Sequence, residues 1–69
     1  MNPADLEALW NEARAAVDIE PGDRASVEAL DLAESGHPSA RAIVDREIAA
    51  FGDTPPVALT RLRIAMGQP

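Results

Sequence analysis

His37 is the only histidine of the sequence, and a serine lies two residues away on each side of it. Histidine and serine are the general base and the nucleophile of hydrolytic triads, in which a third group orients the histidine. Here the histidine falls in the turn Gly36-His37-Pro38, and serines beside a turn usually hydrogen-bond to helix ends. We therefore expect Ser35 and Ser39 to cap helices, and we assign His37 neither a catalytic nor a metal-binding role.

The remaining composition excludes further kinds of site. The 69 residues include no cysteine, so disulfides, thiolate nucleophiles and thiolate metal ligands are impossible, and one histidine cannot build a multi-histidine metal site. The four glycines are isolated and form no phosphate-binding loop. A chain this short is also too small for a substrate cavity of several hundred Å³. We expect no enzyme activity, no catalytic residue, no cofactor, no bound metal ion and no small-molecule substrate.

The charge balance bears on the partners of the protein. Twelve acidic residues and six basic residues, all of them arginine, give a net charge of −6, which phosphate backbones and anionic membranes repel. No apolar run approaches the roughly 18 residues of a membrane span, and residues 1–5 do not resemble a secretory signal. We expect a cytoplasmic protein that binds another protein or itself, but neither nucleic acid nor membrane. The small size and the composition suit a phage or mobile element of a GC-rich host.

Helical periodicity accounts for nearly the whole chain, which we treat as a single domain over residues 1–69. No stretch shows the alternation of a β-strand. The spacing predicts an all-α fold, a compact bundle of three to four short helices. The predicted helices cover about residues 3–17, 24–34, 38–51 and 55–66.

Turn and capping residues mark the ends of these helices. Asn2, Asp23 and Thr54 are the expected N-caps, because their side chains accept hydrogen bonds from the first free N–H groups of a helix. Gly36 and Gly52 follow helical segments and are the expected helix stops.

Apolar stripes indicate which sides of the helices form the core. The second helix is apolar on well over half of its circumference, so we expect it to be central. Trp10 is expected to be structural, because large aromatic residues dominate small cores. The stripes of the first and third helices are Leu6, Leu9, Trp10, Ala13, Val17 and Ala40, Ile43, Val44, Ile48, Phe51.

Three arginines precede an acidic residue by four positions. Side chains at this spacing are neighbours on a helix surface, so we expect exposed ion pairs that contribute a few tenths of a kcal/mol each. The pairs are Arg14–Asp18, Arg24–Glu28 and Arg41–Asp45.

The fourth helix has apolar residues on two sides. Most of its apolar residues form one stripe. Val57 and Ile64 lie on nearly the opposite side of the helix, with Arg61 between them. Either this helix packs in a crevice between two others, or the second side is a protein interface, where arginine is enriched. We assign Val57, Arg61 and Ile64 to partner binding.

Glu47 interrupts the apolar stripe of the third helix, because Ile43, Val44 and Phe51 lie one turn away from it. A buried carboxylate is costly unless it is paired. Glu47 therefore either pairs inside the fold, with Arg61 or Arg63 as the favoured partner, or meets an arginine of another chain. The second possibility makes it a candidate partner-binding residue.

Residues 47–63 resemble a helix-turn-helix, because a helix ends at Gly52, Thr54 opens the next, and Leu59-Thr60-Arg61-Leu62 is similar to a recognition-helix core. In such motifs the first residues of the second helix contact bases. The matching positions, 55–57, are Pro-Pro-Val and offer no side-chain donor.

The leading prediction for function is a small non-enzymatic protein-binding module: a regulator, inhibitor or assembly factor that acts through a helical surface. One alternative is a helix-turn-helix-like DNA-binding regulator or antitoxin, whose dimerisation would concentrate Arg61 and Arg63. Another is a structural subunit of a larger assembly, including a virion. A chain this short buries only about 60% of its unfolded surface, so we expect self-association or tight hetero-association.

Overall fold

The computed structural model of the protein describes residues 3–18 and 24–67. The expected caps Asn2 and Asp23 lie outside these residues. The described residues form four helices and no strand, which confirms the all-α prediction. The helices are α1 (Pro3–Val17), α2 (Arg24–Glu34), α3 (Ala40–Ala50) and α4 (Val57–Met66).

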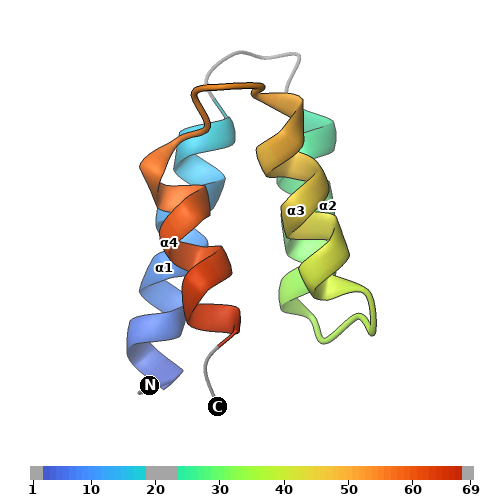
Figure 1. Ribbon diagram of the computed structural model, residues 1–69. Helices are drawn as coiled ribbons and strands as arrows, with labels where there is room; N and C mark the ends of the chain where they lie inside the picture. The colour runs from blue at the N-terminus through green and yellow to red at the C-terminus, as the bar shows by residue number, and fades with distance from the viewer. Residues whose placement is uncertain (1–2, 19–23, 68–69) are drawn as a thin grey trace.

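Successive helices run in opposite directions, up-down-up-down, in a bundle of 32 × 23 × 20 Å (Figure 1). α1 packs against α2 and α4, and α3 also packs against α2 and α4, so α2 and α4 lie diagonally across the bundle. The expectation that α2 is central is wrong. Four helices arranged in this way have no central member, and the Leu32 side of α2 faces solvent.

The core lies along the axis of the bundle, and every helix contributes one side to it. Alanines at three of the buried positions let the helix backbones approach closely, while Trp10 and the leucines fill most of the volume. The buried residues are Trp10, Ala13, Val17, Leu30, Ala33, Val44, Leu59, Leu62 and Ala65.

α4 begins two residues later than the predicted position 55. A residue that precedes proline is disfavoured in the helical region, and both Thr54 and Pro55 precede one. Pro56 has φ −57° and ψ 137° and occupies the N-cap position in place of Thr54, and its carbonyl accepts the N–H of Leu59 at 3.1 Å. The N-cap assignment of Thr54 is therefore wrong.

α3 also begins two residues late, at Ala40 rather than at 38, because residues 37–39 form a turn of their own. The N–H of Ser39 donates to His37 Nδ1 at 3.0 Å, and Ser39 occupies the N-cap without a side-chain capping bond. Ser35 Oγ donates to the Leu32 carbonyl at 2.8 Å, at the end of α2. Of the two serines expected to cap, only Ser35 uses its hydroxyl in this way.

The glycine stops are confirmed. α2 and α3 are each followed by a glycine in the left-handed region, Gly36 at φ 96° and Gly52 at φ 68°. Residues other than glycine rarely adopt this backbone conformation. It lets the chain turn sharply after each helix.

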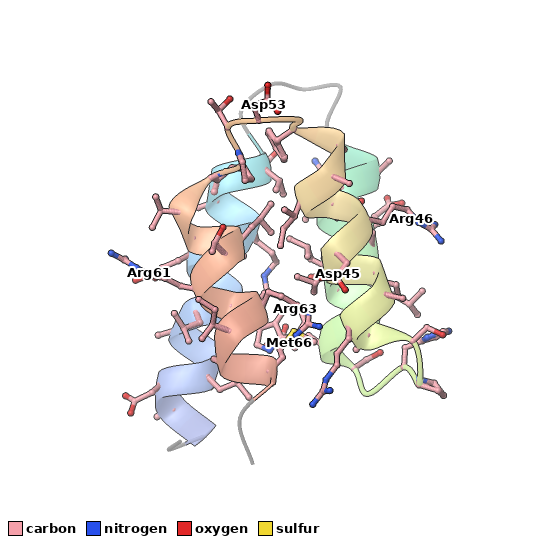
Figure 2. The ribbon with its side chains drawn as sticks, viewed as in Figure 1. Asp45, Arg46, Asp53, Arg61, Arg63 and Met66 are labelled. Carbon is pink, nitrogen blue, oxygen red and sulfur yellow. The ribbon has the colours of Figure 1, made fainter. Side chains whose placement is uncertain are left out.

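Arg14 and Arg63 form ion pairs with a neighbouring helix instead of pairing four residues along their own. Arg14 of α1 pairs with Asp31, at 3.2 Å, and with Glu34, both on α2. Arg63 of α4 pairs with Asp45 of α3 at 2.7 Å (Figure 2). The expected pairs Arg14–Asp18, Arg24–Glu28 and Arg41–Asp45 do not form among the described residues.

The third arginine that crosses to a neighbouring helix is Arg41 of α3. Its guanidinium donates to the carbonyl of Met66 at 2.9 Å. That carbonyl lies in the last turn of α4, where carbonyl groups have no partner within the helix and the helix dipole favours a positive charge.

Trp10 is 5% exposed and belongs to the core cluster, so its removal tests the dependence of the fold on that core. We expect Trp10→Ala to lower the free energy of unfolding by about 3–5 kcal/mol, a large share of the stability of so small a domain. Urea denaturation followed by far-UV circular dichroism measures this. Leu32→Ala, at a half-exposed position, is the control and should cost much less. Equal losses in the two variants would contradict the assigned core.

Candidate functional site

The outer side of α4 presents two large aliphatic side chains to solvent. Val57 is 63% exposed and Ile64 is 60% exposed, whereas Leu59 and Leu62 of the same helix are fully buried. Val57 and Ile64 are seven residues apart, which places them on one face about 10 Å apart along the axis. One explanation for the two apolar sides is that this helix packs in a crevice between two others. No such crevice in the described fold covers Val57 and Ile64.

Arg61 lies beside these two residues and completes what we call the α4 patch: Val57, Arg61 and Ile64. Its side chain points away from the bundle, on the side of α4 opposite to Arg63 (Figure 2). Arg61 makes no ion pair or side-chain hydrogen bond among the described residues, whereas Arg63 is held by Asp45.

Two further arginines, Arg24 and Arg46, also have neither an ion pair nor a side-chain hydrogen bond in the described parts of the chain. Arg46 points away from the bundle on the far side of α3 (Figure 2). Its neighbours one turn away toward the C-terminus are Ala49 and Ala50, so no large exposed aliphatic side chain accompanies it. Arg61 differs from both because it lies between two such residues.

Glu47 is half-buried and does not pair inside the described fold. Positions 45 and 47 are about 200° apart around a helix. Because Asp45 faces Arg63 on α4, Glu47 lies on the opposite flank of α3, toward α2. Neither Arg61 nor Arg63 makes an ion pair or hydrogen bond with Glu47, so the favoured internal pair is not found.

The carboxylate of Glu47 remains hydrated. No buried side-chain oxygen or nitrogen of the described residues lacks a hydrogen-bond partner. Since half-buried Glu47 has no partner there, its oxygens are not fully buried and reach solvent. The structure therefore brings Val57, Arg61 and Ile64 together on one surface and places Glu47 on a different one.

A shallow hollow of about 230 Å³ lies where α1 meets the end of α2, lined by Leu6, Glu7, Trp10 and Glu34. Two apolar side chains and two carboxylates therefore line it. Glu34 is already engaged by Arg14, so the two acids are not an isolated pair of carboxylates. His37 contributes to its own turn and does not line this hollow.

Sequence reasoning missed the role of Arg14, which joins α1 to α2. Its partners Asp31 and Glu34 are 17 and 20 residues away, and no local spacing signals a contact at that separation. It also missed that Leu32 is exposed, because a helix that is apolar on most sides was expected to be central.

Residues 3–18 and 24–67 contain no group of three or more histidine, aspartate or glutamate side chains placed to hold a metal ion. None of the helices in these segments has the length and apolar character needed to cross a membrane. The chain matches no protein-family model, no curated protein and no solved structure.

Because Glu47 makes no ion pair in the described fold, its removal should not strand a charge. We expect Glu47→Leu to raise the free energy of unfolding by about 0.5–1 kcal/mol, since leucine adds apolar contact and one negative charge is lost. Chemical denaturation measures this. Glu47→Gln, which removes only the charge, separates the two contributions.

The same measurement tests the internal pair. In a double-mutant cycle of Glu47→Leu with Arg63→Leu, the two effects should be additive within about 0.5 kcal/mol. If Glu47→Leu lowered the free energy of unfolding by more than about 2 kcal/mol and coupled strongly to Arg63→Leu, the two side chains would be paired. That result would contradict the placement of Glu47 away from Arg63.

Proposed function

We propose that this chain is a small acidic, non-enzymatic protein-binding module, a regulator, inhibitor or assembly factor, that acts through the α4 patch. The observation that carries the proposal is the exposure of Val57 and Ile64 on either side of an arginine without an intramolecular partner in the described fold. Single exposed aliphatic residues are ordinary, but two of them around a free arginine combine apolar area with a directional donor.

Energetics supports a protein partner for this surface. Fully burying an aliphatic side chain contributes about 1.5–3 kcal/mol, and arginine is among the residues that most often dominate binding energy. α4 contains two arginines and no acidic residue, although the whole chain has a net charge of −6. The patch therefore differs in charge from most of the molecule and fits an apolar surface that carries a carboxylate.

The arrangement of α3 and α4 favours this function over DNA binding. The two helices of a helix-turn-helix cross at about 90–120°, whereas α3 and α4 run antiparallel side by side (Figure 1). The first turn of α4 offers Val57 and Ala58 where base contacts would be made, and Arg63 is already paired with Asp45.

We also propose a cytoplasmic location. Small secreted domains commonly rely on disulfides to compensate for a small core. This sequence has no cysteine, and its core is held by side-chain packing.

Charge reversal at the centre of the patch tests the proposal. Arg61→Glu should weaken the complex with a partner by at least about 10-fold, because like charges across an interface are costly. The melting temperature should hardly change, since Arg61 is exposed and makes no ion pair or side-chain hydrogen bond within the described fold. Affinity capture from the native host, read by mass spectrometry, identifies the partner, and titration of the purified pair measures the affinity.

The matched control is Arg46→Glu, which makes the same charge change at an exposed, unpaired arginine away from the patch. A partner that binds the wild type and Arg46→Glu but not Arg61→Glu supports the proposal. Equal binding to all three proteins would overturn it, and so would a large loss of stability in Arg61→Glu.

A further inference from the structure

The outer side of α2 is a second surface that no other described residue covers, and its chemistry is complementary to the α4 patch. Leu32 is 50% exposed, and Glu28 lies one turn before it on the same exposed side. Glu28 makes no ion pair or side-chain hydrogen bond in the described parts of the chain, although Arg24 precedes it by one turn.

One copy of the chain cannot bring these two surfaces together. α2 and α4 lie diagonally across the bundle, each packed between α1 and α3, so their outer sides point away from each other (Figure 1). An unpaired acid beside an exposed leucine therefore lies on one side of the molecule. An unpaired arginine between two exposed aliphatic residues lies on the other.

We infer that the α4 patch of one copy binds the outer side of α2 of a second copy. Arg61 pairs with Glu28 of the second copy, and the leucine at position 32 packs against Val57 and Ile64. The inference rests on the proposed function and deepens it by naming the partner. In a pair held by this contact, one copy still has a free α4 patch and the other still has a free outer side of α2. Further copies can therefore add head to tail, which gives a ring or an open chain.

Charge favours this head-to-tail contact over a symmetric one. Two α4 patches facing each other would bring two arginines together. A contact between two α2 surfaces, although it could pair Arg24 with Glu28, would leave the α4 patch uncovered. The net charge of −6 on each copy opposes any association at long range. The assembly is therefore weak and depends on protein concentration.

A charge exchange tests both the contact and its direction. The full chain is studied by sedimentation velocity at physiological salt, from micromolar to about 1 mM, as wild type, Arg61→Glu, Glu28→Arg, the double variant and an equimolar mixture of the two single variants. The average mass of the wild type should rise with concentration. Each single variant should associate at least about 10-fold more weakly than the wild type.

The mixture and the double variant should recover association, because each then contains opposite charges on facing surfaces. Arg46→Glu is the control and should behave as the wild type, and circular dichroism confirms that every variant is folded. A wild type that stays monomeric up to about 1 mM overturns the inference. Single variants that associate normally, or a mixture that does not recover, also overturn it.

These results are separable from the test of the proposed function. A monomeric wild type whose capture of a different protein depends on Arg61 overturns only the self-association and leaves the proposed function supported. If Arg61→Glu changes neither self-association nor capture, both the inference and the proposed function are wrong.

Discussion

The fold depends on burying one side of each of four short helices in a single narrow core. The helices are 15, 11, 11 and 10 residues long, and isolated helices shorter than about 12–15 residues are marginal in water. Each helix therefore persists because two neighbours cover its apolar side. Fully buried Leu30, Leu59 and Leu62 supply much of the apolar area, and buried Ala13 and Ala33 let the backbones come close enough for that packing.

Because one side of every helix is buried in the core, the charged side chains are confined to the surface of the bundle. The described chain has no buried charged residue, and three of its arginines lie at the edges between helices. Arg14, Arg41 and Arg63 each reach a neighbouring element there. Partly exposed ion pairs of this kind contribute only about 0–1 kcal/mol each. Their main effect is on geometry, because each favours one neighbour and one register over others. Arg61 has no such role, and this leaves it available for another molecule.

The α4 patch is a consequence of the same constraint. α4 has apolar residues on two sides, but the core accepts only the side that carries Leu59, Leu62 and Ala65. Val57 and Ile64 are on the far side of a helix that lies at the periphery, so no other part of the described chain can cover them without disrupting the core. Exposed apolar area lowers the solubility of a domain with so small a core. This cost is the physical reason behind the proposed binding role of the α4 patch.

The helices and their apolar stripes could be predicted from the sequence alone, because periodicity and turn chemistry are local properties. The same local rules missed the start of α4, where restrictions from consecutive prolines act together and Pro56 becomes the cap. Periodicity tells which residues share a side of a helix, but not which sides find neighbours. Only the tertiary structure decided that Leu32 and Val57 face solvent, that Glu47 lies away from Arg63, and that Arg14 reaches α2. These outcomes depend on how four helices meet in space, and partners 17 to 20 residues apart share no spacing that a sequence pattern records.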